Sequence, residues 1–158
     1  MKFLATKELK DNPFLKNLLA GLLVLITLFL LLDLLLHHVQ IGLSFDSAIT
    51  TLLGNEEEFI EPLLFDSLLI MIHTNLFFSM LLLLILSAIW IRVSKQPKDF
   101  KIFLHALFLL AIFAPIFLLF GYFFGELGVK IWVVMFISWH FLAFFMSVQT
   151  MIRLYKNG

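Results

Sequence analysis

Four long apolar stretches constrain this chain more than any other feature of its sequence. They cover residues 18–36, 63–91, 102–124 and 129–152. Each reaches the length of about 20 residues that an α-helix needs to cross the hydrocarbon of a bilayer. Helices are expected because lipid offers no hydrogen-bonding partner to an unpaired backbone group. The sequence therefore predicts an all-α integral membrane protein, with residues 1–158 forming a single membrane domain.

The composition excludes the main alternatives to a membrane protein. Hydrophobic residues make up 62% and charged residues 14% of the chain, against about 45–50% and about 25% in soluble domains. A soluble domain of 158 residues could not bury that much apolar surface. Eleven basic residues balance eleven acidic ones, which argues against a nucleic-acid partner. The absence of cysteine excludes disulfides, thiol catalysis and covalent c-type haem attachment.

The basic residues indicate the orientation of the four spans. They gather before the first stretch, between the second and third, and after the fourth, whereas the connection 39–61 contains none. Lys and Arg favour the cytoplasmic side of a membrane. We therefore expect both termini inside, most simply in a bacterial-type inner membrane. The connections 94–99 and 125–128 are short, with Pro97 as a helix stop, and predict an up-down-up-down four-helix bundle.

Smaller signals concern the connections and the packing. Ser44 and Gly54 predict a short helix over residues 45–53, lying in the outer interface. Small residues four apart, which let membrane helices approach closely, predict two packing sites. These pairs are Gly121 with Gly125 and Ala143 with Ser147. Pro115, in the middle of the third span, predicts a kink.

Ionisable residues within the spans are the candidates for function, since each is costly in lipid and needs a partner. They are Asp33, His37, His38, Asp66, His73, His105 and His140. Asp33 and His37 are four residues apart and share a helix face. Asp66, His73 and Met80 recur every seven residues and share another, beside a polar stripe of Asn75 and Ser79. We expect an outer-half His/Asp cluster if these faces point inward. His105 is expected at the cytoplasmic boundary.

The primary functional prediction is a b-type haem electron-transfer subunit. His73 and His140 come from different helices at similar heights, as bis-histidine ligation of haem b requires. Asp66 would orient a ligand or meet a propionate, and Met80 would be an alternative ligand. The architecture resembles that of small four-helix membrane b-type cytochromes, which is an analogy of fold alone.

Three alternatives remain open. Asp33, His37, His38 and His73, joined by Asp66, could bind a transition metal ion such as copper, zinc or iron. Asp33, His73 and His140 could form a proton relay of a transporter. The chain could also be a structural or assembly subunit, bound to another membrane subunit or to copies of itself, with polar groups linking its helices. No motif of a soluble-type catalytic site occurs, so no catalytic residue is predicted.

Overall fold

The computed structural model describes residues 12–93 and 100–156, and in these ranges its fold is all-helical. Its regular elements there are five helices and no strand, and residues 54–64 form a non-helical connection with an isolated bridge between Asn55 and Ile60. Their bounds are α2 (Pro13–Gln40), α3 (Phe45–Leu53), α4 (Phe65–Val93), α5 (Phe100–Phe124) and α6 (Glu126–Lys156). The predicted helix stop at Pro97, and the basic residues at 2, 7, 10, 95 and 98, lie outside the described residues.

Four of these helices are long and apolar enough to cross a membrane, namely α2, α4, α5 and α6. They extend beyond the predicted apolar stretches because polar residues continue or cap them. α2 begins five residues early at Pro13, where the side chain of Asn12 accepts hydrogen bonds from the backbone nitrogens of Phe14 and Leu15 at 3.1 and 3.2 Å. At about 1.5 Å per residue, a helix of this size also reaches the headgroup regions.

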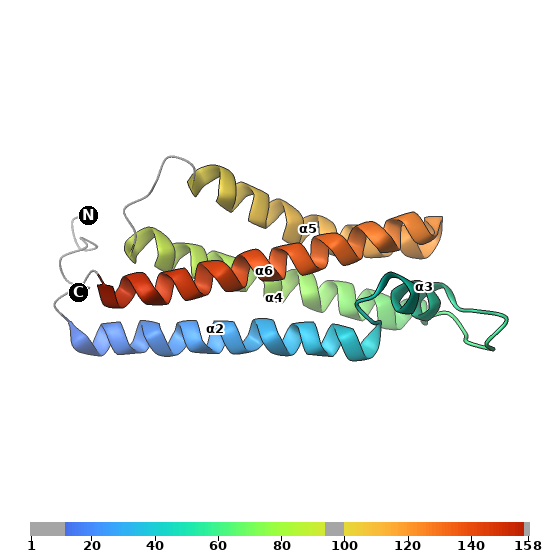
Figure 1. Ribbon diagram of the computed structural model, residues 1–158, viewed down its shortest axis with the longest axis horizontal. Helices are drawn as coiled ribbons and strands as arrows, with labels where there is room; N and C mark the ends of the chain where they lie inside the picture. Colours follow the sequence, from blue (N-terminus) through green and yellow to red (C-terminus); the bar gives the residue numbers. More distant parts are fainter. Residues whose placement is uncertain (1–11, 94–99, 157–158) are drawn as a thin grey trace.

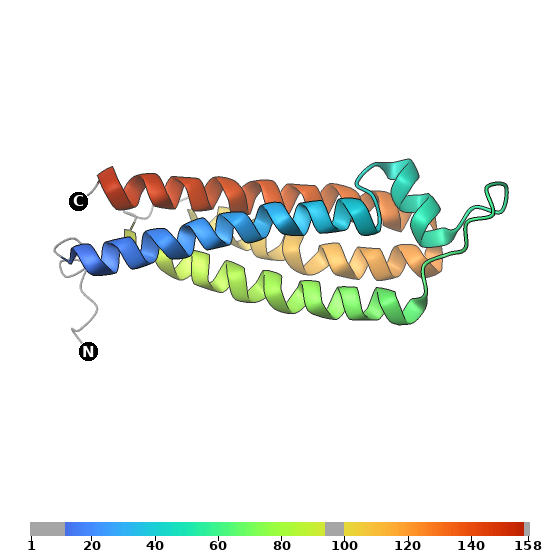
Figure 2. The same ribbon diagram turned by 90° about the horizontal axis from the view of Figure 1, so that it is seen from below.

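The long helices lie lengthwise beside one another, with α6 in contact with every other described helix (Figures 1 and 2). Its most extensive contact is with α5, and α2 packs mainly on α6. α2 and α4 meet only slightly. The start of α2 and the end of α6 are at one end of the molecule, and α3 is at the other (Figure 1).

The connection between α2 and α4 contains α3, the short helix predicted over the same residues. Its Ser44 side chain accepts a hydrogen bond from the backbone nitrogen of Ser47 at 3.2 Å, and the helix ends at Gly54. Ala48 and Leu52 are fully buried, and α3 contacts α6. Phe45, the first residue of the helix, remains 45% exposed. The helix therefore covers the end of the bundle with Ala48 and Leu52.

The contact between α5 and α6 is closest where two glycines meet. A Cβ atom on Gly128 would lie 2.5 Å from the Cα atom of Gly121. The predicted pair of small residues was Gly121 with Gly125, but Gly125 has a φ of 97° and lies beyond the end of α5, in the tight turn that joins the two helices. The sequence thus identified Gly121 as a packing residue but missed Gly128, because small residues on one helix do not show which residue of the next helix they meet.

We predict that Gly128→Ala destabilises the protein by about 1–3 kcal/mol, since its methyl group would force α5 away from α6. Unfolding of the purified protein in detergent, followed by circular dichroism, measures this effect. Gly21→Ala is the matched control, because a Cβ there meets nothing within 4 Å. Equal stability of the Gly128→Ala and Gly21→Ala variants would contradict the close approach of the two helices.

Candidate functional site

Three of the long helices bring four polar side chains together inside the bundle. We call this set the polar cluster: Asp33 and His37 from α2, Asn75 from α4 and His140 from α6. Asp33 and His37 lie one helical turn apart, so both point toward the same neighbours. His140 and His37 are 1% and 3% exposed, and the Asp33 side chain is 13% exposed. The cluster is thus sheltered from the surroundings of the protein.

Asp33 and His140 form the central contact of the cluster. Nε2 of His140 lies 2.8 Å from Oδ2 of Asp33, and its Nδ1 lies 2.8 Å from the backbone oxygen of Phe136. A neutral imidazole carries one N–H, but here both ring nitrogens face oxygen atoms. Either His140 is doubly protonated beside a carboxylate, or a protonated Asp33 donates to Nε2. In both cases Asp33 and His140 share one proton and are neutral as a pair.

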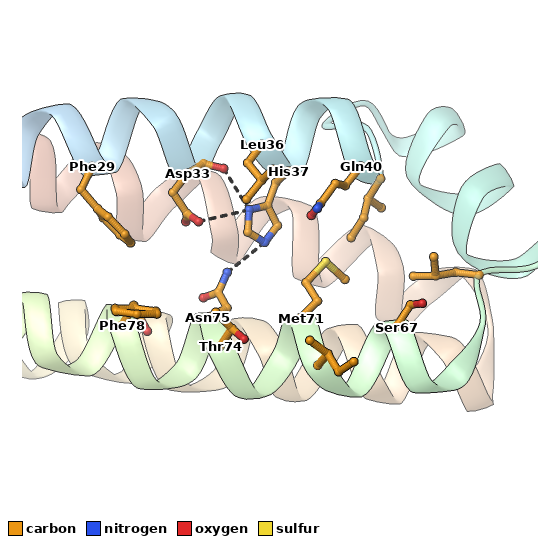
Figure 3. A pocket seen from close by; sticks show the side chains of 14 residues that line it. Phe29, Asp33, Leu36, His37, Gln40, Ser67, Met71, Thr74, Asn75 and Phe78 are labelled. Atoms are coloured by element: carbon orange, nitrogen blue, oxygen red, sulfur yellow. Dashed lines mark hydrogen bonds and ion pairs between the residues drawn. The ribbon is translucent and has the colours of Figure 1, made fainter.

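His37 links this pair to α4. Its Nδ1 lies 2.9 Å from the backbone oxygen of Asp33 and 3.4 Å from the carboxylate atom Oδ1. Its Nε2 lies 2.9 Å from Nδ2 of Asn75 (Figure 3). With the amide placed this way, Asn75 donates to Nε2, so the proton of a neutral His37 is on Nδ1. Hydrogen bonds therefore join Asn75 to His37 and Asp33 to His140, and the 3.4 Å contact between His37 and the Asp33 carboxylate connects the two pairs.

Aromatic rings enclose the histidines. The ring of Phe136 lies between them, with its centroid 4.4 Å from that of His37 and 4.2 Å from that of His140. The ring of Trp139 is also close, at 3.7 Å from His140. Phe136 and Trp139 are themselves buried. Hydrogen bonds in such apolar surroundings are electrostatically stronger than in water.

A cavity of about 570 Å³ between α2 and α4 adjoins the polar cluster (Figure 3). Asp33, His37 and Asn75 line it, whereas His140 does not, so Asp33 stands between the cavity and His140. Phe29 and Phe78, whose rings are 6.1 Å apart, face each other at one end. The remaining lining residues are Leu36, Gln40, Ile41, Leu63, Ser67, Ile70, Met71, Thr74 and Ser79.

A second polar link joins α2 to α6, nearer to Pro13. The hydroxyl oxygens of Thr27 and Ser147 are 2.9 Å apart, and each also contacts the backbone oxygen of Leu23. Ala143 and Ser147, predicted as a packing pair, are both fully buried. Ser147 therefore contributes a hydrogen bond to α2 in addition to its small size.

The structure brings only some of the predicted site residues together. Asp33, His37 and His140 meet, but His38, Asp66 and His73 are exposed, and Met80 is partly buried outside the cluster and the cavity lining. His73 and Asn75 are two positions apart and therefore point in nearly opposite directions on a helix. Because Asn75 faces inward, the face of His73 points outward. The inward side of α4 is thus the neighbouring stripe of Asn75 and Ser79, which the sequence showed without assigning it a role.

The geometry gives no support to the predicted haem ligands or metal site. His73 is exposed, while both ring nitrogens of His140 have partners within the protein. Within residues 12–93 and 100–156, no group of three or more His, Cys, Asp or Glu side chains is arranged to hold a metal ion. His105 is exposed, with Nδ1 close to the backbone oxygen of Lys101. Haem and metal binding thus stay predictions from the sequence.

Comparison with known proteins adds no constraint on function. No family model, curated protein or solved structure matches this chain. The polar cluster and the adjoining cavity are therefore the basis for inferring what the protein does.

We predict that Asp33→Asn and His140→Ala are energetically coupled by about 1 kcal/mol or more in a double-mutant cycle, because each removes the partner of the other. Unfolding free energies of the four proteins in the same detergent give the coupling. His105→Ala combined with Asp33→Asn is the control, since His105 has a similar backbone contact but no contact with Asp33. Additive effects of Asp33→Asn and His140→Ala would show that the two side chains do not interact.

Proposed function

We propose that this protein moves protons within the membrane through the polar cluster. In this proposal the four long helices span the membrane in an up-down-up-down bundle with both termini in the cytoplasm. The segregation of Lys and Arg along the sequence supports that orientation. The cluster then lies in the outer half of the bundle, and the end with α3 is outside. Membrane proteins that move protons commonly use chains of Asp, Glu and His.

The observation that carries the proposal is the position of His140 between two acceptors. Its Nε2 is 2.8 Å from Asp33, and its Nδ1 is 2.8 Å from the oxygen of Phe136. The shared proton can lie on Asp33 or on His140 while the two atoms stay at hydrogen-bonding distance. A site of this kind accepts or releases a proton with little rearrangement of the helices.

The hydrogen bonds suggest a route for the proton on both sides of this pair. On the outer side, Asp33 lines the cavity directly, beside His37 and Asn75. Toward the other end, Thr27 and Ser147 are the next polar pair. Ser147 is seven residues beyond His140 on the same helix, a rise of about 10 Å that water would have to bridge. The contacts thus support the part of the route from the outside to Asp33 better than the part from His140 to Ser147.

We predict that Asp33→Asn reduces proton flux into proteoliposomes by about tenfold or more, because the amide cannot take up the shared proton. A pH-sensitive dye inside the vesicles reports the flux when a potassium gradient and valinomycin set the potential. His105→Gln is the control and should conduct as the wild type does, since its side chain lies outside the cluster. Wild-type vesicles no more permeable to protons than empty vesicles would overturn the proposal.

Solid-state NMR of ¹⁵N-labelled histidine gives a second measurement of the same site. We expect the wild-type spectrum to contain one histidine whose proton is shared with a carboxylate, and Asp33→Asn to remove that signal. The signals of His38 and His105, which are exposed, should not change with this substitution. This measurement shows whether the cluster holds a shared proton, whereas the flux measurement shows whether the protein conducts protons. A cluster that holds the proton without conducting would thus be recognised.

A second candidate function, an assembly subunit, is favoured by the exposure of His73. This side chain lies on the third turn of α4, a helix that is apolar enough to span the membrane, yet it points outward. An ionisable side chain facing lipid is costly, whereas a neighbouring membrane protein or a second copy could supply a hydrogen bond.

We predict that His73→Leu releases the chain from a larger assembly if this second function holds. Native gel electrophoresis of mildly solubilised membranes measures the size of the particle before and after the change. His105→Leu, an exposed histidine near the start of α5, is the control and should leave the assembly intact. A wild-type chain that migrates as a monomer would exclude this function.

A further inference from the structure

The cavity between α2 and α4 is large enough for a ligand and opens toward lipid. Its volume of about 570 Å³ is within the range of about 300–1,000 Å³ that is common for small-molecule sites. Leu36 and Ile70 line it, yet they are 50% and 68% exposed on helices apolar enough to span a membrane. Because exposed side chains of such helices face hydrocarbon, a ligand could enter from the bilayer between these two residues.

The lining determines which head group the cavity can accept. Among the described residues that form it, Asp33 and His37 are the ionisable ones, and none is Lys or Arg. A phosphate or carboxylate head would therefore meet Asp33 without a compensating cation from the lining. The other polar groups, Gln40, Thr74 and Asn75 among them, are amides and hydroxyls that suit uncharged donors and acceptors.

A cationic head group is also disfavoured. Asp33 is already paired with His140 at 2.8 Å and lies 3.4 Å from Nδ1 of His37. An ammonium group would have to displace one of these partners. By contrast, Nδ2 of Asn75 is bonded to His37, which leaves the amide oxygen of Asn75 as an acceptor for a hydroxyl group.

The shape of the lining places the apolar part of such a ligand. Phe29 and Phe78 close one end of the cavity with their rings 6.1 Å apart. From Phe29 to Gln40 the lining of α2 rises by about 16 Å, at about 1.5 Å per residue. A head group beside His37 and Asn75 would thus have Phe29 and Phe78 on its side nearer to the start of α2. Its one alkyl chain would leave the cavity between Leu36 and Ile70.

We propose that this cavity binds an uncharged amphiphile with one alkyl chain, whose head group carries hydroxyl or carbonyl oxygens. A lipid-soluble quinone or quinol and a monoacylglycerol share this chemistry. The inference rests on the proposed function only in that both involve Asp33 and His37. Binding needs the space between α2 and α4, whereas proton movement needs the proton shared with His140, so either can fail without the other.

Titration of ten-carbon probes into nanodiscs that contain the full chain tests the proposal. The uncharged probes are decylbenzoquinone, its quinol and monodecanoylglycerol; the charged ones are decanoate and decyltrimethylammonium. Empty nanodiscs give the partition of each probe into lipid. We expect saturable binding of at least one uncharged probe and none of the charged ones, and the probe that binds identifies the source of the ligand. Saturable binding of decanoate or decyltrimethylammonium, or of no probe, would overturn the proposal.

Variants of the lining establish where the probe binds. Thr74→Phe fills the cavity and should weaken binding by about tenfold or more, the equivalent of about 1.4 kcal/mol. Leu84→Phe is the matched control on the same helix, since Leu84 is exposed and does not line the cavity. Ile70→Trp, which narrows the opening, is a second test if Thr74→Phe does not fold. Wild-type affinity in the folded lining variants would exclude the cavity as the site.

Discussion

The contact between Asp33 and His140 fixes the position of α2, on which the cavity and the polar cluster both depend. α2 is mostly exposed, since only 22% of its most apolar 18-residue stretch is buried within the protein. Apolar packing therefore holds it only weakly, and lipid is no worse a neighbour for leucine than another helix is. A buried carboxylate without a partner would be costly there, so the 2.8 Å contact with α6 specifies how α2 is placed. α2 then lies against α6 and leaves space beside α4.

His140 is held in a defined position for this contact because α6 packs against more of the other helices than any other described helix does. α6 packs against α2, α3, α4 and α5, and the approach of Gly121 to Gly128 brings α5 against its first turn. Trp132, Phe136 and Trp139 are buried around His140. A functional side chain on a helix held from several sides keeps its orientation better than one on a loop. Asp33, on the less supported helix, is the member of the pair whose position can change.

The sequence predicts the fold more completely than it predicts the residues of the site, and the reason is physical. The four long apolar helices and α3 follow from local properties: length, hydropathy and the cap at Ser44. Asp33 and His37 follow from a spacing of four within one helix. The inward face of α4 does not, because a helix that is apolar all round carries little signal of its orientation. His73 was therefore chosen over Asn75, and Gly121 was paired with Gly125 along one helix, whereas Gly128 of α6 is the residue that it meets.

A comparison of the two polar links between α2 and α6 explains why we propose proton movement for the cluster rather than simple cohesion. Thr27 and Ser147 join these helices through hydroxyl groups alone, at 2.9 Å and without an ionisable atom. Asp33 and His140 form the same kind of link with groups that are more costly to bury. A buried ionic pair is weak evidence for added stability, because apolar or neutral side chains can replace it. What Asp33 and His140 add is a proton that either can hold, and Asp33 itself lines the cavity together with His37 and Asn75.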